Sequence, residues 1–167
     1  MKIKTKSKMI KQFIGLLVAL LTLSVSAQQE PQFTQYMYNP SQINPAYSGS
    51  LGYATSFGLY RAQWVGLDGA PKTANISFNK PIENTKLGYG INILNDRIGP
   101  SELTYFNVDL SYTLLFGDES RLAFGLKAGG ELLNIDFSKL SQYNPGDVLL
   151  QNNVNRFSPN IGAGVYY

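Results

Sequence analysis

Hydrophobic and polar residues alternate with a period of two along most of the chain after residue 72. The alternation is clearest in residues 103–115, where even positions are mainly apolar and odd positions mainly polar. It recurs in residues 73–80, 87–94, 121–134 and 157–167. A period of two is typical of β-strands, in which successive side chains point to opposite faces of the sheet. The sequence therefore predicts an all-β chain folded as an antiparallel meander.

The first predicted strand, residues 53–64, is less regular than the others. Its alternation changes phase between Leu59 and Tyr60. A β-bulge adds one residue to one strand of a pair and so shifts the alternation by one position. We interpret the break as a bulge.

The polar positions of these strands are small and mostly uncharged. Gly, Asn, Ser and Thr predominate there, and most charged residues after residue 50 fall in the predicted turns. A soluble β-sandwich would instead expose a face rich in Lys and Glu. The strands of an outer-membrane β-barrel alternate lipid-facing apolar side chains with lumen-facing polar ones. The pattern therefore favours a transmembrane outer-membrane β-barrel over a soluble sandwich.

The segments between the strands support this interpretation, because outer-membrane barrels alternate long external loops with short periplasmic turns. With a periplasmic N-terminus, the predicted long loops are residues 65–72, 95–102 and 138–156, and the predicted short turns are residues 81–86 and 117–120. About six strands result, fewer than the roughly eight that close a membrane barrel. An open edge cannot face lipid. We therefore expect residues 53–167 to be the N-terminal part of a larger, truncated barrel rather than a unit that pairs with other chains.

Residues 1–27 have the features of a secretory signal peptide. Five lysines precede an apolar run at residues 13–23, and small residues lead to a predicted cleavage site after Ala27. The apolar run is shorter than the ~20 residues of a membrane helix. Without this leader the chain has more acidic than basic residues, which argues against nucleic-acid binding. Residues 28–52 form a predicted extended N-terminal segment that either plugs the barrel or contacts a periplasmic partner.

The composition excludes much catalytic and metal-binding chemistry. The chain contains no cysteine and no histidine, which removes thiolate and imidazole ligands, the catalytic triad and a histidine general base. The asparagine-rich loop around Asp147 has only one carboxylate, so it is interpreted as a turn rather than a calcium site. We therefore predict a protein that is not an enzyme and has no cofactor, metal, nucleic-acid partner or small-molecule substrate.

The hairpin around residues 117–120 allows a prediction of register. Directly opposed residues point to the same face, so the polar, odd-numbered positions of its two strands must face one another. A loop of three or five residues would place Asp109 opposite Gly129 and diagonal to Lys127 and Glu131. The other register in which odd-numbered residues face one another places Asp109 directly opposite Lys127. In either register we expect Asp109, Lys127 and Glu131 to face the lumen, with Asp109 within salt-bridge or diagonal reach of Lys127.

Four stretches of the chain resemble a known family. They are residues 30–40 (EPQFTQYMYNP) with 43–50 (INPAYSGS), residues 59–73 (LYRAQWVGLDGAPKT), residues 94–100 (LNDRIGP) and residues 122–129 (LAFGLKAG). In this order and spacing they resemble the PorP/SprF family of type IX secretion system membrane proteins of Bacteroidetes. Members of that family are longer, so the resemblance implies that this chain is their N-terminal half.

The resemblance implies an outer-membrane β-barrel of the secretion and gliding machinery that supports secretion or surface attachment of large adhesins. It implies as partners the lipid bilayer and either machinery subunits, an adhesin with a C-terminal sorting domain, or both. The alternative is an outer-membrane channel that passes small polar solutes. Tyr60 and Trp64 are more simply interpreted as aromatic residues at a membrane interface. The motif residues selected as candidate partner contacts are Pro31, Gln32, Tyr36, Asn44, Pro45, Tyr60, Arg61, Gln63, Trp64, Gly66, Gly69 and Pro71.

Overall fold

The computed structural model describes residues 36–116, 120–139 and 152–167, all within the unit formed by Gln32–Tyr167. The predicted signal peptide, Pro31, Gln32, the turn at residues 117–119 and the loop around Asp147 lie outside the described residues.

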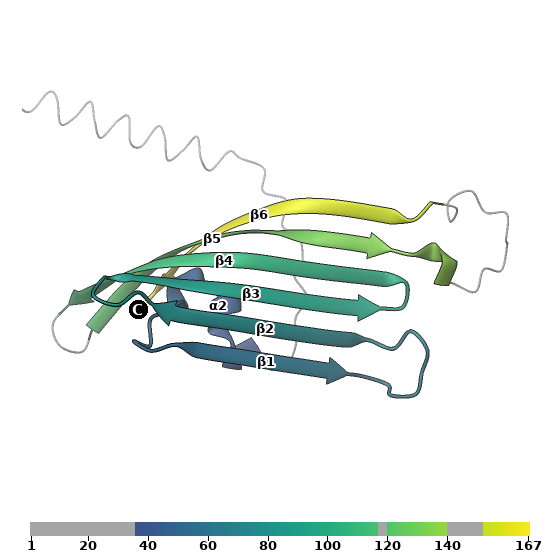
Figure 1. Ribbon diagram of the computed structural model, residues 1–167, viewed down its shortest axis with the longest axis horizontal. Coiled ribbons are helices and arrows are strands. Elements are labelled where there is room, and N and C mark those ends of the chain that lie inside the picture. Colours follow the sequence, from purple (N-terminus) through teal and green to yellow (C-terminus); the bar gives the residue numbers. More distant parts are fainter. Residues whose placement is uncertain (1–35, 117–119, 140–151) are drawn as a thin grey trace, which may run out of the picture. The chain divides into compact units, whose positions relative to one another are not determined.

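The described strands form one antiparallel sheet in which each strand pairs with the next in sequence (Figure 1). They are β1 (Thr55–Ala62), β2 (Lys72–Pro81), β3 (Leu87–Ile98), β4 (Ser101–Phe116), β5 (Ser120–Ile135) and β6 (Val154–Tyr166). This order confirms the predicted all-β meander. The sheet is open, with β1 and β6 at its edges, as expected for part of a barrel.

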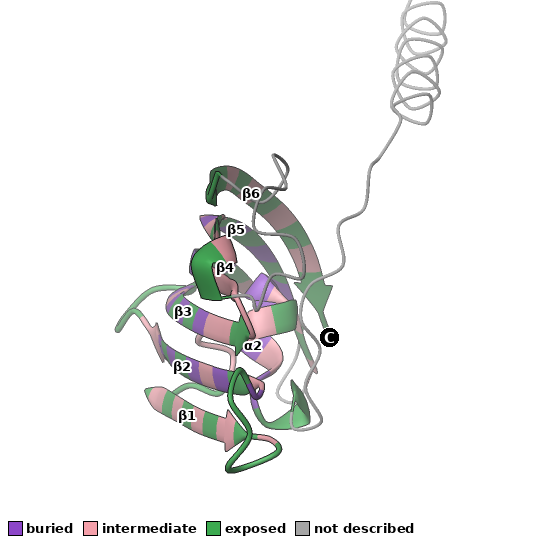
Figure 2. Ribbon diagram, turned by 90° about the vertical axis from the view of Figure 1, so that its right-hand side faces the viewer, coloured by how far each residue is buried: buried purple, intermediate pink, exposed green. Residues whose placement is uncertain are grey.

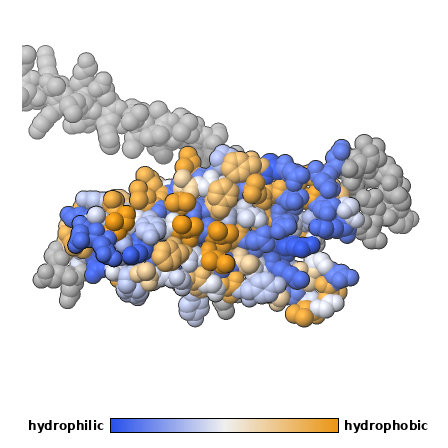
Figure 3. All heavy atoms as spheres, in the orientation of Figure 1, coloured by the Kyte–Doolittle hydropathy of each residue, from blue (hydrophilic) through white to orange (hydrophobic). Residues whose placement is uncertain are grey.

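The two faces of the sheet differ sharply in burial. On the outer face, apolar side chains such as Ile91, Val108 and Leu126 are 45%, 55% and 65% exposed, whereas on the inner face Asn75 and Asp109 are fully buried. The buried and exposed classes alternate along the strands in Figure 2. Figure 3 shows hydrophobic residues gathered over the middle of one face. An exposed apolar surface of this kind is typical of a face that contacts lipid or a partner.

The first strand contains no bulge, so the sequence interpretation was wrong at this point. β1 pairs with β2 without interruption from Thr55, opposite Asn79, to Ala62, opposite Lys72. The phase break arises because Leu59 lies on the inner face, where it packs in an apolar cluster with Leu94, Leu103 and Tyr105. Tyr60 points outward and is 69% exposed.

The connections follow the predicted lengths except at one end of β3. Residues 63–71 and 136–153 separate β1 from β2 and β5 from β6, and residues 82–86 separate β2 from β3. The predicted long loop at residues 95–102 is wrong, because β3 and β4 pair as far as Ile98 opposite Ser101. Gly99 and Pro100 alone connect them, and Gly99 adopts a φ of +56°. A positive φ at the first turn residue allows a tight hairpin of this kind.

Residues 36–52 are not extended, contrary to the prediction. They form the 3-10 turns η1 (Tyr36–Tyr38) and η2 (Pro45–Tyr47) on either side of the single-turn helix α2 (Pro40–Ile43). Pro40 and Pro45 each stand at the first position of their turn. Proline is favourable there because the backbone N–H that it lacks would have no partner within the helix. No helix among the described residues is long and apolar enough to cross a membrane.

Candidate functional site

The inner face of the sheet is covered by residues 39–49, which we call the docked segment. α2 lies against the sheet, which curves around it (Figure 2), and η2 contacts β4, β5 and β6. Beneath the segment, the inner face presents a set of buried polar side chains that we call the inner wall: Asn75, Ser77, Asn79, Asn92, Asn107, Asp109, Ser111 and Lys127. The candidate site is the contact between this segment and this wall.

The start of the docked segment is held by an amide and hydroxyl cluster. Asn39 donates to Asn75 Oδ1 at 2.9 Å and accepts at its own Oδ1 from Ser77 Oγ at 3.0 Å. Ser41 Oγ lies 2.8 Å from Asn39 Oδ1 and 3.3 Å from Asn92 Oδ1. All five side chains are buried. Their mutual hydrogen bonds satisfy groups that would otherwise be costly to bury.

The end of the docked segment meets the carboxylate of Asp109. Ser48 Oγ donates to Asp109 Oδ2 at 3.2 Å, and Asn92 Nδ2 donates to the same oxygen at 2.7 Å. Ser111 Oγ donates to the backbone carbonyl of Ser48. One strand, β4, therefore holds both the side chain and the backbone of Ser48.

Gln42, in the middle of the segment, is held on two sides. Lys127 Nζ donates to the backbone carbonyl of Gln42. Asn75 Nδ2 donates to Gln42 Oε1 at 2.5 Å. The charge of Lys127 is thus directed at the docked segment.

Glycines of the inner face make room for the segment's backbone. A Cβ atom built on Gly90 would lie 2.5 Å from Ser48 Oγ, and one on Gly88 would lie 2.6 Å from Ser111 Oγ and 3.0 Å from Gly49 Cα. One on Gly125 would lie 2.5 Å from Ala46 Cα. Gly88 and Gly125 cannot carry a side chain while the segment stays docked, because backbone atoms of the segment lie against them, whereas Gly90 faces the side chain of Ser48. The docked segment is thus what crowds the sheet at these glycines.

Asn44 and Pro45, two of the selected motif residues, belong to this contact. Asn44 Oδ1 accepts from the Ala46 backbone N–H at 3.0 Å, and Asn44 Nδ2 donates to the Val165 carbonyl of β6 at 2.9 Å. Pro45 is buried. Tyr36, a third motif residue, is 52% exposed. Asn44 therefore ties the N-terminal region to the last strand.

The predicted inward orientation of Asp109 and Lys127 agrees with the structure, but the register that we placed first is wrong. Asp109 pairs directly with Lys127, and the pairing runs on to Phe116 opposite Ser120. In the register with Gly129 opposite Asp109, Phe116 would instead have paired with Leu122. Glu131 also lies on the inner-face side of β5 and is partly exposed.

The remaining motif residues cluster in β1 and in the loop at residues 63–71. Arg61 is partly buried on the inner-face side of β1. The Gln63 N–H donates to the Pro71 carbonyl at 3.0 Å and closes the loop. Gly66 and Gly69 have positive φ values of 97° and 75°, and Trp64 has a φ of 49°. Because a positive φ is unusual for a bulky residue, Trp64 is the strained position of the loop.

This loop displays large apolar side chains. Trp64, Val65 and Leu67 are 69%, 89% and 63% exposed. The Gly69 carbonyl accepts from the Gly99 N–H at 2.9 Å, which joins the loop to the tight β3–β4 hairpin. The loop is thus anchored at its base while its apolar side chains remain free for contact.

A polar cleft lies at the same end of the sheet and was not foreseen from the sequence. It has a volume of about 210 Å³ and is lined by Arg97, Pro100, Glu102, Asn134, Asp136, Lys139, Asn153 and Asn155. The residues come from three separate segments of the chain, residues 97–102, 134–139 and 153–155. No local motif signals their proximity.

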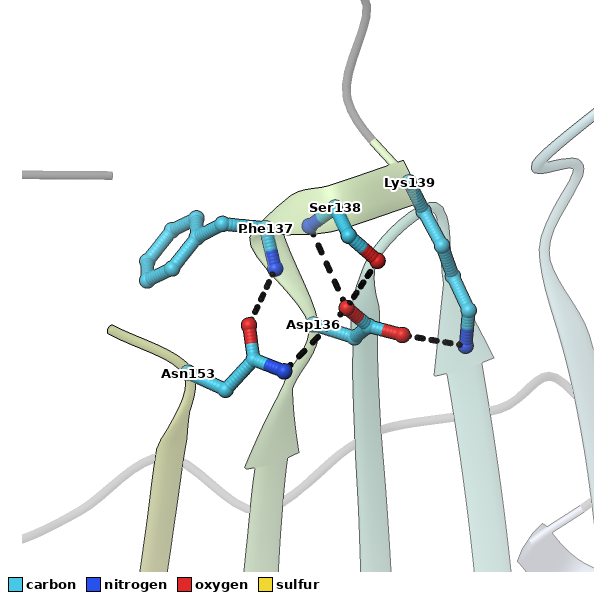
Figure 4. A network of polar contacts seen from close by, with 5 residues as sticks. All are labelled: Asp136, Phe137, Ser138, Lys139 and Asn153. Atoms are coloured by element: carbon cyan, nitrogen blue, oxygen red, sulfur yellow. Dashed lines mark hydrogen bonds and ion pairs between the residues drawn. The ribbon is translucent and has the colours of Figure 1, made fainter. Parts of the chain in front are cut away.

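Asp136 organises one side of this cleft (Figure 4). Its Oδ1 accepts from Ser138 Oγ at 2.6 Å, from the Ser138 N–H at 3.2 Å and from Asn153 Nδ2 at 3.3 Å, and its Oδ2 lies 3.4 Å from Lys139 Nζ. The Ser138 hydroxyl bond is the largest cause that holds the pKa of this carboxyl below its ordinary value. Hydrogen bonds to the ionised form have this effect.

The described parts of the chain contain no group of three or more carboxylate, thiol or imidazole side chains that could hold a metal ion. The site is built instead from amides, hydroxyls and one pair of opposite charges, a set suited to binding polypeptide. A search of curated proteins and of solved structures found no match. The family described as type IX secretion system membrane protein PorP/SprF matches residues 25–167. The chain therefore belongs to the PorP/SprF family of membrane proteins of type IX secretion.

Proposed function

We propose that this protein is a non-enzymatic outer-membrane component of the type IX machinery that supports secretion or surface attachment of large adhesins. Family membership supports a place in this secretion system. The exposed apolar outer face supports insertion of the strands into lipid. In this proposal residues 1–27 are the signal peptide, residues 28–52 the N-terminal segment and residues 53–167 part of the barrel wall.

The observation that carries the proposal is the exposed apolar loop at residues 63–71. Trp64 combines 69% exposure with a positive φ, and strained backbone at an exposed position is more typical of an interaction site than of a structural turn. Trp is also enriched in the energetic centres of protein interfaces. The loop therefore suits contact with a machinery subunit or with the adhesin. Tyr60, Gln63 and Pro71 would frame this contact.

The alternative, a channel for small polar solutes, has less support. Its hydrophilic path would run along the inner wall, and the docked segment covers the wall at Asn75, Asp109 and Lys127. An open channel would leave these side chains in contact with water. With the segment docked, the wall offers a solute no hydrophilic path, which favours a scaffold over a permanently open channel.

Co-purification tests the proposal in cells that carry the type IX machinery. The tagged protein is extracted from carbonate-washed membranes in mild detergent, and its partners are identified by mass spectrometry. We expect machinery subunits or an adhesin with the wild type, and their loss with Trp64→Ala. Phe116→Ala, which removes a 56% exposed aromatic at the opposite end of the sheet, is the matched control. Full recovery of the intact protein in the soluble fraction, or equal recovery of partners with both variants, would contradict the proposal.

A further inference from the structure

We propose that residues 39–49 are a displaceable plug, which leaves the inner wall as a unit while the sheet stays folded. This inference concerns the chain's own segment and does not depend on which secreted protein is the cargo. It rests on the kind of contacts that hold the segment and on the state of the charges beneath it.

The contacts between the segment and the inner face of the sheet are mainly polar. The side chains that hold it are Asn39, Ser41, Gln42, Asn44 and Ser48, all through hydrogen bonds. The apolar contacts are those of the buried residues Pro45 and Ala46 and of Tyr47, whose partly buried ring packs edge-on against Tyr166 with the centroids 5.2 Å apart. Water can replace each hydrogen bond when the segment leaves, so each contributes little net stability. The strands, in contrast, are joined by continuous backbone ladders.

The docked state also carries a cost at the charged pair. Asp109 is fully buried, and its Oδ1 is one of the buried oxygens that has no hydrogen-bond partner among the described residues. Lys127 is 6% exposed. Undocking would hydrate both groups, and hydration favours the open state because burial of charge is expensive. The hydrogen bonds that hold the segment are therefore opposed by the cost of the buried charges, so the segment can undock reversibly.

The open state would present a hydrophilic strip on β2–β5. Asn75, Ser77, Asn92, Asp109 and Lys127 would all reach water at once, since the same segment covers them. The strip offers amide donors and acceptors with one charge of each sign. It is suited to an extended polypeptide backbone.

Thiol labelling tests displacement directly, because the chain contains no cysteine. Single variants Ser48→Cys on the plug and Ser77→Cys on the wall are expressed in full-length protein in native outer membranes and treated with a membrane-impermeant maleimide that reaches the periplasm in permeabilised cells. Both positions are 2% exposed or less, whereas Ile43→Cys, on the same segment and 61% exposed, measures the unhindered rate. Heat-modifiable gel mobility verifies that each barrel is folded.

We expect both buried cysteines to react at one common rate, about 10- to 1,000-fold slower than Ile43→Cys, as for a segment that opens as a unit. Reaction as fast as Ile43→Cys would show that the segment is not docked. Complete protection of both, or clearly different rates for the two, would show a static segment or local fraying. Either result overturns the proposal.

A disulfide lock gives an independent measurement. A Cβ at Gly90 would lie 3.1 Å from Ser48 Cβ, a few tenths of an ångström less than the usual separation of about 3.5–4.5 Å across a disulfide. The lock is Ser48→Cys/Gly90→Cys, and Ser77→Cys is added to it as a reporter. The reporter should not react with the maleimide under oxidising conditions. After reduction it should react at the labelling rate of the single variant Ser77→Cys. Unchanged labelling of the reporter in the oxidised lock, verified by mass spectrometry, would overturn the proposal.

Discussion

Asp109 and Lys127 stand directly opposite each other on β4 and β5, and each holds a different part of the docked segment. The carboxylate accepts from Ser48 and the ammonium donates to the Gln42 carbonyl. One pair of cross-strand neighbours thus holds the segment at Gln42, in α2, and at Ser48, directly after η2. Opposite charges on adjacent strands attract most strongly where water is excluded.

The first prediction concerns loss of one charge. Lys127→Met leaves the carboxylate of Asp109 buried without its counter-charge, a situation that costs about 3–5 kcal/mol for a fully buried pair. Because undocking relieves this cost, we expect release of the segment rather than unfolding of the sheet. The measurement is the labelling rate of Ser48→Cys in this background, which should rise at least about tenfold, with each 1.4 kcal/mol worth a factor of ten.

The double variant Asp109→Asn/Lys127→Met is the control for this prediction. It removes both charges, so its labelling rate should lie closer to that of the parent than the rate of Lys127→Met does. Equal rates for the single and double variants would show that the two charges do not act as a pair. Glu131→Gln, on the same strand, should leave the rate unchanged.

The second prediction concerns the glycines under the segment. Gly125→Val should displace the segment, since even a Cβ at residue 125 would lie 2.5 Å from Ala46 Cα. Gly162→Val is the matched control on β6, where the nearest atom to a new Cβ is Lys127 Cβ at 3.6 Å, an ordinary contact. Limited proteolysis of the N-terminal segment should accelerate only in Gly125→Val. Similar cleavage of both variants would show that substitution of any inner-face glycine loosens the segment.

The third prediction concerns the lipid face. Val108→Arg should destabilise the full-length barrel by about 2–4 kcal/mol, because an arginine near the middle of a lipid-facing strand is costly. Unfolding by urea in lipid vesicles measures this. Ser111→Arg, the control that the sequence alone would suggest, is unsuitable because Ser111 is 2% exposed beneath Ser48. Asn160→Arg, on the partly exposed inner face of β6, is the better control and should cost less than about 1 kcal/mol. Equal costs would invert the assignment of faces.

The fourth prediction concerns pH at the polar cleft. The pKa of Asp136 is held below its ordinary value chiefly by the Ser138 hydroxyl. A carboxyl with a lowered folded pKa adds stability above its unfolded pKa of about 3.9, and this stability is lost as pH falls through the lower folded value. Ser138→Ala should therefore raise the midpoint of the Asp136 carboxyl titration, followed by ¹³C NMR, toward the ordinary value.

Lys139→Met provides the comparison, because the ion pair between Lys139 and Asp136 lowers the pKa of Asp136 less than the Ser138 hydroxyl does. The Lys139 side chain is also about half exposed. The substitution should move the titration less than Ser138→Ala. A larger shift with Lys139→Met would mean that charge attraction, rather than hydrogen bonding, controls this carboxyl.

The sheet could be predicted from the sequence because its outer face is apolar and its inner face mainly polar, and this difference produces a period of two along each strand. Residues 103–115 alternate so regularly that both faces of β4 were assigned correctly. The sequence also predicts that odd-numbered residues of β4 pair with odd-numbered residues of β5, since a shift by one residue would exchange the two faces. The exact register did not follow, because it depends on where the turn is centred, and residues 117–119 carry no unique turn signal.

Two features were mispredicted for a common reason. Leu59 looked like a bulge, and residues 95–102 looked like a loop, because each departs from the alternation that apolar-out and polar-in strands should show. Leu59 instead faces an inner apolar cluster, and Asp96 of β3 accepts from Thr73 of β2 at 2.6 Å. Contacts between distant residues explain both, and no local pattern contains them.

The docked segment was harder still to foresee. Its short turns have no hydrophobic period, and its partners lie up to 121 residues away, as for Asn44 and Val165. The one usable signal was the run of glycines on the inner face of β3, β5 and β6. Such positions mark close approach of another backbone, although they do not say which backbone it is.

The bond between Asn44 and the Val165 carbonyl has a consequence for the order of folding. The segment is synthesised before the six described strands, but its anchor at Val165 does not exist until β6 has formed. Contacts of such long sequence separation form slowly, because the intervening chain must be ordered first. Residues 39–49 therefore lack this anchor until β6 has joined the sheet, and their contact with the wall is completed only after the six described strands have paired.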